Sequence, residues 1–193
     1  MHQATTTPGQ SAAVQRVALA VDHGVLTFSR YWAPMLAAVV APIVALPALA
    51  PILEASGRHR TADVIYFVYG FVCHQRPERS LHIHGEQMAF CARDLAITGT
   101  FLLALIIAAV LPVVRRVQPG SFIMASVASL PMAVDGFSQL FGLRESNLEL
   151  RLLTGALFSL GWAWFAIPRL DVGFREVVAT VQERTNSGVT SDQ

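Results

Sequence analysis

The feature that most constrains this chain is an uncharged stretch of 23 residues, YWAPMLAAVVAPIVALPALAPIL, which runs from Tyr31 to Leu53. About 20 apolar residues are enough for a helix to cross the hydrocarbon of a bilayer. The four prolines in this stretch would break a helix in water. In a membrane, neighbouring helices can satisfy the backbone carbonyls that prolines leave free. The stretch therefore predicts a kinked transmembrane helix.

The composition supports a membrane protein. The chain has 193 residues, of which 53% are hydrophobic and 14% are charged, and its mean hydropathy is +0.49. This is more apolar than an ordinary soluble domain. A formal net charge of +1 gives no electrostatic reason to expect nucleic acid as a partner. We expect membrane lipid to be the main surrounding of this chain.

Further apolar stretches complete a predicted bundle over residues 30–168. Three of them are predicted to be spans, and a fourth is too short to cross and is predicted to be a half-inserted helix; they lie at about 95–114, 121–137, 151–168 and 61–72. The predicted fold class is an all-α membrane protein, a polytopic bundle of four transmembrane helices plus the half-inserted helix. Residues 1–29 are predicted to be a disordered or amphipathic segment, and residues 169–193 a surface helix with a disordered tail.

The connection at residues 73–94 concentrates the chemistry of the chain. It contains both cysteines and three of the six histidines. Thiolate, imidazole and carboxylate groups are the ligands that zinc takes in proteins. The predicted metal ligands are Cys73, His74, Cys91 and Asp94, with His82 and His84 as further candidates.

The same two cysteines permit other states. A disulfide that closes this loop of about 18 residues would contribute on the order of 3 kcal/mol in the chain-entropy model. The cysteines could also remain as buried free thiols that pack like small apolar groups. The sequence leaves these alternatives open.

A second polar cluster follows near the end of the third span. Asp135 and Gln139 are four residues apart and would share one face of a helix. A carboxylate this close to the hydrocarbon needs a partner, and we predict an ion pair of Asp135 with Arg144 or Arg151. Ser146 is the predicted N-cap of the last helix.

Polar residues from both segments are predicted to surround the metal as supporting groups or as a pocket for an anionic ligand, such as a lipid head group. They are Gln75, Arg79, Arg93, Asp135, Gln139, Arg144 and Arg151. If the protein is an enzyme, hydrolysis by metal-bound water is the simplest reaction, and Glu78, Glu86 and Asp135 are the candidate catalytic groups. The sequence has no nucleophile–base motif and no phosphate loop, so enzymatic activity stays an open question.

The orientation follows from a pair of arginines. Arg115 and Arg116 lie in a very short connection between two predicted spans, which favours the cytoplasm for that connection. The connection at 73–94 is then expected on the extracytoplasmic face, and residues 138–151 return to the same face.

Three sequence blocks also resemble a known family. CHQRPERS, then CAR, then PMAVDGFSQ with GLRESN and LRLLTG are similar to the domain of unknown function 2085 family of small predicted bacterial and archaeal membrane proteins. The resemblance covers about residues 66–161. The second block of the family usually reads Cys-x-Arg-Cys followed by Thr-Gly, where this chain continues with Asp94, Leu95 and Ala96. The resemblance implies a multi-pass protein of the bacterial cytoplasmic (inner) membrane with a polar cysteine–histidine site, and it implies no reaction.

The sequence is therefore consistent with two functions. The first is a membrane protein with a metal site, with zinc as the expected ion, on the extracytoplasmic face. The alternative is a disulfide-stapled accessory or structural subunit that docks on other membrane protein subunits. A transporter is less favoured, because the spans show no inverted repeat.

Overall fold

The computed structural model describes residues 8–190, and within them the side chains of residues 16, 17 and 19–184. The chain forms two compact units. One consists of Met1–Trp32 with Leu170–Gln193, which we call the arm unit, and the other is Ala33–Arg169, which we call the bundle unit. All of the predicted site residues lie in the bundle unit.

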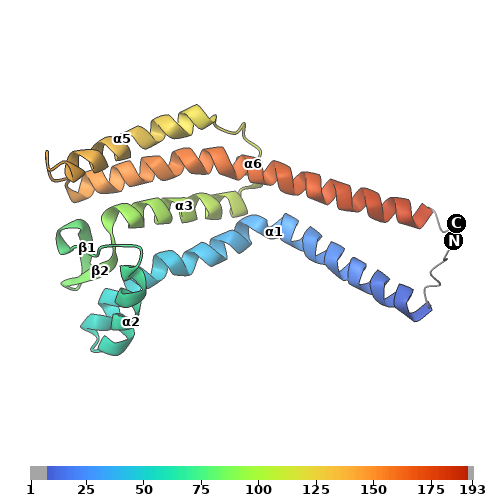
Figure 1. Ribbon diagram of the computed structural model, residues 1–193, viewed down its shortest axis with the longest axis horizontal. Coiled ribbons are helices and arrows are strands. Elements are labelled where there is room, and N and C mark those ends of the chain that lie inside the picture. Colours follow the sequence, from blue (N-terminus) through green and yellow to red (C-terminus); the bar gives the residue numbers. More distant parts are fainter. Residues whose placement is uncertain (1–7, 191–193) are drawn as a thin grey trace, which may run out of the picture. The chain divides into compact units, whose positions relative to one another are not determined.

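Six helices make up most of the described chain. They are α1 (Pro8–Ala55), α2 (His59–Gly70), α3 (Ala92–Val110), α4 (Pro112–Arg115), α5 (Phe122–Leu140) and α6 (Leu148–Thr190). Within the bundle unit, the end of α1, all of α2, the start of α3, the end of α5 and the start of α6 gather at one end (Figure 1). We call this the site end. The connection around α4 lies at the opposite end.

Three of these helices are long and apolar enough to cross a membrane, at Leu19–Ala55, Ala92–Val110 and Leu148–Arg184. Large apolar side chains on these helices stay exposed, among them Ile106 of α3 and Leu153 of α6. Such surfaces are unusual on a soluble protein and are typical of contact with lipid. The protein is therefore a helical, multi-pass membrane protein.

The helix α5 has the same length as α3, 19 residues, but is not among these three candidates. Its polar residues Asp135 and Gln139, together with Pro131, make it less apolar. The fourth crossing expected from the sequence thus stays a prediction.

The helix ends differ from the predicted ones. The first helix already begins at Pro8, because the alanine-rich sequence after this residue has a high helix propensity; residues 1–7 of the predicted disordered segment lie outside the described residues. The last helix continues through Pro168 to Thr190, and residues 191–193 of the predicted tail lie outside the described residues. The third helix stops at Val110, because Pro112 starts the separate short helix α4.

Two prolines within the helices leave backbone carbonyls whose hydrogen bonds come from other segments. Pro47 cannot donate to the carbonyl of Ile43, and the hydroxyl of Tyr69 on α2 donates to that oxygen instead, at 3.0 Å. Pro168 likewise leaves the carbonyl of Trp164 free, and the backbone N–H of Gly120 donates to it at 3.3 Å. These contacts confirm that other parts of the bundle satisfy the freed groups.

The Tyr69 hydrogen bond leads to a testable prediction. Replacing Tyr69 with phenylalanine is expected to lower the free energy of unfolding in detergent by about 1–3 kcal/mol, because the Ile43 carbonyl loses its donor at a part-buried position beside the buried Tyr69. In a Pro47→Ala background the restored N–H can bond this carbonyl within the helix, so the same change should cost less. Chemical denaturation of the four proteins measures the difference. The exposed Tyr31, changed to phenylalanine, is the control, and equal losses in both backgrounds would contradict the assignment.

The connection between α2 and α3 is not a plain loop, which corrects the all-α prediction. It contains a short 3₁₀ turn (Pro77–Arg79) and an antiparallel hairpin of β1 (Ser80–Ile83) and β2 (Glu86–Cys91). His84 and Gly85 form its two-residue turn with φ values of 55° and 84°. Positive φ at both positions matches the twist of a tight hairpin. The hairpin ends at Cys91 and so delivers this residue directly to the start of α3.

Glycines let α6 approach its neighbours closely. A Cβ atom at Gly155 would lie 3.0 Å from the Cβ of Ala96 on α3, and one at Gly161 would lie 2.6 Å from the Cβ of Ala128 on α5. Small residues at such positions allow membrane helices to pack backbone against backbone. The close spacing of α3, α5 and α6 therefore depends on glycine and alanine at these contacts.

In the arm unit, the two helices pack through aromatic rings. The ring of Phe174 lies 5.4 Å from that of Phe28 and 5.5 Å from that of Trp32. Non-helical dihedrals at Tyr31, three residues before Pro34, mark the kink that the sequence predicts in this helix.

Candidate metal and anion site

Three of the four predicted metal ligands converge at the site end of the bundle unit. The sulfur atoms of Cys73 and Cys91 and a carboxylate oxygen of Asp94 all lie within 4.8 Å of one another. Both cysteines are free thiols in this structure. His74 follows Cys73 in the chain but is exposed, and its ring nitrogens are not part of the group.

Local hydrogen bonds hold the three groups in place. The backbone N–H of Cys73 donates to the carbonyl of Tyr69 at 2.9 Å, which fixes the residue just beyond the end of α2. The sulfur of Cys73 accepts the backbone N–H of Cys91 at 3.1 Å. Cys91 is the N-cap of α3, and its thiol donates to Asp94 in the first turn at 3.1 Å. Cys91 and Asp94 therefore meet at the first turn of α3.

Burial governs the protonation of the thiols. Cys73 packs among Ile65, Tyr69 and Phe90, and burial raises the pKa of its thiol to about 12. Burial also raises the pKa of Cys91. Desolvation disfavours a thiolate in the absence of a positive partner. At neutral pH both thiols carry their protons, and a metal would have to displace them.

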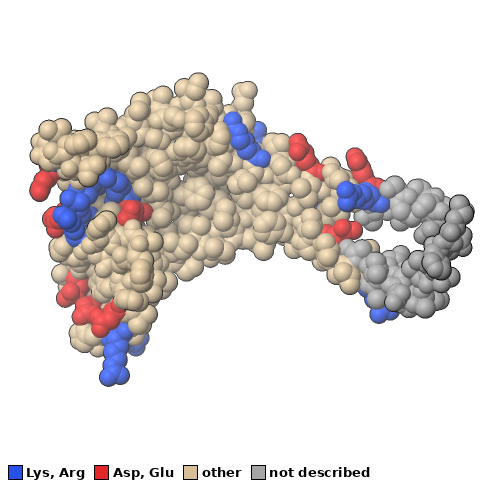
Figure 2. Space-filling model, in the orientation of Figure 1, with Lys and Arg blue, Asp and Glu red and all other residues tan. Residues whose placement is uncertain are grey.

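The three groups face a polar pocket of about 220 Å³. Residues of the loop after α2, the end of β2 and the starts of α3 and α6 line it: Val72, Cys73, His74, Gln75, Arg76, Arg79, Cys91, Arg93, Asp94 and Arg151. Figure 2 shows basic side chains gathered at this end of the bundle unit, with acidic ones beside them. Of the predicted supporting residues, the pocket thus includes Gln75, Arg79, Arg93 and Arg151.

Asp135 lies behind this pocket and is the centre of a buried ion-pair network. The residue is 1% exposed. Its carboxylate accepts hydrogen bonds from Arg93 of α3, from Gln139 at 3.0 Å and from Arg144 at 2.7 Å. The predicted pair with Arg144 is confirmed. The predicted alternative with Arg151 is wrong, because Arg151 donates to the side-chain oxygen of Gln139 instead.

Gln75 positions the hairpin. The side-chain amide of Gln75 donates to the backbone carbonyl of Tyr66 at 2.7 Å. The backbone carbonyl of Gln75 accepts a hydrogen bond from the side-chain amide of Gln87. The backbone of Gln75 has a positive φ of 48°, which turns the chain from α2 toward β1. Gln75 therefore acts in the structure as a link between α2 and the hairpin.

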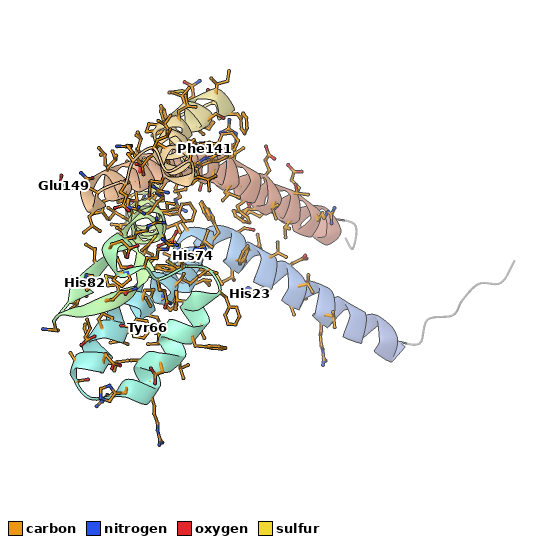
Figure 3. All side chains as sticks on the ribbon, turned by 60° about the vertical axis from the view of Figure 1, so that its left-hand side comes forward. His23, Tyr66, His74, His82, Phe141 and Glu149 are labelled. Carbon is orange, nitrogen blue, oxygen red and sulfur yellow. The ribbon has the colours of Figure 1, made fainter. Side chains whose placement is uncertain are left out.

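Several predicted candidates lie away from the pocket lining. His82 belongs to β1 and His84 to the hairpin turn, and Figure 3 shows His82 well separated from His74. His84 has a positive φ of 55° and lies in the turn, beyond the end of β1. Glu78 and Glu86 are exposed, and Glu78 forms only long ion pairs of 3.9 Å with Arg76 and Arg79.

Two features of this region were not recognised in the sequence. Arg76 lines the pocket but is not among the supporting residues predicted from the sequence. Asn147, rather than the predicted Ser146, caps α6, because its side-chain oxygen accepts the backbone N–H of Leu150 at 2.8 Å. The helix begins one residue later than the capping-box pattern indicates.

Comparison with known proteins assigns the chain to a family. The model of the family described as "Predicted membrane protein (DUF2085)" matches residues 73–165. An uncharacterized protein of Methanocaldococcus jannaschii is 39% identical over 108 residues, which are 54% of this chain and 67% of that protein. An uncharacterized protein of Methanothermobacter thermautotrophicus is 34% identical over 98 residues, which are 49% of this chain and 84% of that protein. The chain belongs to the DUF2085 family.

The residues matched by the DUF2085 model begin at Cys73 and include Cys91, Asp94, Asp135 and Arg151. The complete candidate metal group and the ion-pair network behind it therefore lie in the family region. Both relatives are archaeal, so the bacterial membrane expected from the sequence stays a prediction. No solved structure matches the chain.

Proposed function

We propose that this DUF2085 protein binds one metal ion through Cys73, Cys91 and Asp94. The proposal rests on one observation: ligand atoms from the loop after α2, the end of β2 and the first turn of α3 converge within 4.8 Å at a polar pocket. Two thiolates and a carboxylate suit zinc, which takes sulfur and oxygen ligands in tetrahedral sites. The neighbouring His74 or a water molecule would supply the fourth ligand.

We further propose four membrane crossings, with α5 as the third in chain order. The helix α3 ends at the end of the bundle unit opposite to the start of α6, and α5 is the long helix that joins these two places (Figure 1). If α3 and α6 both cross, α5 must return across the same layer. Its 19 residues would extend about 28 Å, close to the hydrocarbon thickness. The 12 residues of α2 are too few to cross.

With this topology the site would lie outside the cytoplasm. Arg115 and Arg116 lie in the connection at the end opposite to the site, and basic residues in short connections favour the cytoplasmic face. The metal group would then face the extracytoplasmic side of a cytoplasmic membrane. The second candidate function, an accessory subunit stapled by a disulfide, would use the same cysteines in oxidised form.

The proposal concerns metal binding rather than a reaction. Asp94 is the only carboxylate among the described pocket-lining residues, and as a metal ligand it would not be free to act as a base. The sequence-based candidates Glu78 and Glu86 lie outside the lining, and Asp135 is held by its ion pairs.

We predict about one zinc per chain in protein purified in a mild detergent without chelator or immobilised metal, measured by mass spectrometry. The Cys73→Ser, Cys91→Ser variant should lose this metal. Because binding displaces thiol protons, the metal content should fall as the pH is lowered. The exposed His82→Ala variant should keep the metal and serves as the control.

Counting free thiols on the same sample separates the candidates, since the chain has two cysteines. Protein without metal and without free thiols would support the disulfide staple and refute the metal site. Protein without metal but with two free thiols, unchanged in stability when zinc is added, would refute both.

A further inference from the structure

The pocket beside the proposed metal ligands carries an unusual excess of positive charge. Four arginines line it: Arg76, Arg79, Arg93 and Arg151. Asp94 is the only carboxylate among the described lining residues, and the ion-pair partners of the lining add Glu78 and Asp135, the latter shared with Arg144. Five arginines thus stand against three carboxylates, a surplus of two positive charges.

A bound metal would not remove this surplus. A divalent ion held by two thiolates brings two positive and two negative charges to the pocket, so the balance of the remaining groups is unchanged. Arginine, moreover, keeps its charge at all accessible pH values. The lining and its ion-pair partners thus leave two positive charges available for an anion from outside the chain.

The arginines are placed close together rather than spread over the surface. Arg151 is 4% exposed, and the charges of Arg79 and Arg93 act on it unfavourably. The Nε atom of Arg93 is buried and has no hydrogen-bond partner in the described structure. Cationic groups held together in this way, with an unused donor, are typical of a site that binds an anion.

The start of the helix α3 also favours an anion in the pocket. Its first turn lines the pocket through Arg93 and Asp94, and no side chain caps the helix at Cys91. The free N–H groups at the start of a helix carry a partial positive charge and favour anions. A volume of about 220 Å³ is several times the roughly 30 Å³ that one water molecule occupies in the liquid, so the pocket can hold a hydrated anion.

We infer that this pocket binds a phosphate group through Arg76, Arg79, Arg93 and Arg151. A phosphate monoester carries up to two negative charges, which match the surplus of two, whereas a single carboxylate would leave one charge without a partner. Guanidinium groups bind phosphate oxygens in a two-pronged geometry. The inference extends the proposed metal site by the class of ligand beside it, and its test does not require the metal.

The pocket lies where the membrane-spanning helices α3 and α6 begin, which is the depth of lipid head groups. The phosphate could therefore belong to a lipid or to a soluble ester. Both sources present the same group to the arginines, and an experiment can distinguish them.

The test is isothermal titration of the full chain in a non-ionic detergent at low ionic strength, after removal of metal by a chelator and dialysis. The titrants are sodium phosphate, short-chain phosphatidic acid, the matching uncharged diacylglycerol, and sodium acetate. We expect phosphate or phosphatidic acid to bind and diacylglycerol and acetate not to bind. Phosphatidic acid at least tenfold tighter than phosphate identifies a lipid ligand, and similar affinities identify a soluble one.

The test variant is Arg76→Gln, Arg79→Gln. These side chains are 56% and 36% exposed and form only the long ion pairs with Glu78, so their loss should leave the fold intact. We expect affinity to fall on the order of tenfold or more, because each removed arginine takes charge-assisted hydrogen bonds with it. Arg60→Gln, an exposed arginine of α2 outside the pocket, should bind like the wild type.

Three results would overturn the inference: no binding of either phosphate compound to the wild type, equal binding of acetate, or an equal loss in the Arg60→Gln control. These results are independent of the metal measurement. The Cys73→Ser, Cys91→Ser variant loses the proposed metal but keeps all four arginines, so it should still bind the phosphate compound.

Discussion

Replacing Asp135 with asparagine is expected to lower the free energy of unfolding in detergent by about 3–5 kcal/mol. The change keeps the size of the side chain but removes its charge. Arg93 and Arg144 would then lose the carboxylate that both of them contact. A cation left without its partner at a buried site costs much more than the pair contributes, because the desolvation of the charge is no longer offset.

The surroundings of Asp135 make this a large effect. The carboxylate is 1% exposed and joins α3, α5 and the segment before α6. Gln139 donates to the same carboxylate and accepts a hydrogen bond from Arg151, so the disturbance should reach the pocket. Thermal or chemical denaturation would measure the loss.

The matched control is Asp63→Asn, which removes the same charge from an exposed position on α2. It should change stability by less than about 0.5 kcal/mol. A second variant, Asp135→Asn with Arg93→Gln, removes both charges of one pair and should recover part of the loss. If Asp135→Asn were as stable as Asp63→Asn, the ion-pair network would make no contribution to the free energy of unfolding.

The second large effect is expected at Gly161. Replacing this glycine with leucine should destabilise the protein by about 1–3 kcal/mol, because even the first added carbon would lie 2.6 Å from the Cβ of Ala128. The backbones of α5 and α6 would have to separate. The effect can be measured by denaturation and by the phosphate titration, since α5 and α6 carry Asp135 and Arg151.

A smaller pair of changes tests the same contact more specifically. Gly161→Ala alone should destabilise, and Gly161→Ala with Ala128→Gly should restore stability because the methyl group is only moved across the interface. Gly173→Ala lies in the same helix with no atom within 4 Å of the added carbon, and should be neutral or slightly stabilising. A loss at Gly173 equal to that at Gly161 would show that helix flexibility, rather than packing, is responsible.

The helical part of the fold could be predicted well from sequence, because uncharged stretches of about 20 residues have few alternatives to crossing a bilayer. The helices α1 and α6 contain two of the predicted spans, and α3 contains most of a third, up to Val110. The predicted span at 121–137 falls on α5, whose crossing stays a prediction. The hairpin could not be found by this route, since its strands have only 4 and 6 residues and contain polar residues. Its signal was nevertheless present in the pair His84–Gly85 between two short runs with strand character.

Most residues of the site could be predicted from the sequence, but only some of the contacts between them could. Cys91 and Asp94 are three residues apart, so local geometry was sufficient to bring them together. The pair of Arg93 with Asp135 joins residues 42 positions apart and depends on how α3 packs against α5. The close contact of Arg93 with Gly136, 3.6 Å from a Cβ built there, has no counterpart in a sequence pattern.

The separation of these contacts along the chain also bears on how the protein is made. Cys73 and Cys91 are 18 residues apart and belong to one connection, so the sulfur groups can meet as soon as α3 is in place. Arg93 must wait for Asp135, which is synthesised 42 residues later. At about 5–20 residues per second, this interval lasts roughly 2–8 s. For that time α3 enters the bilayer without the carboxylate that pairs with Arg93 in the finished fold, and the pocket is completed only when the last helix arrives.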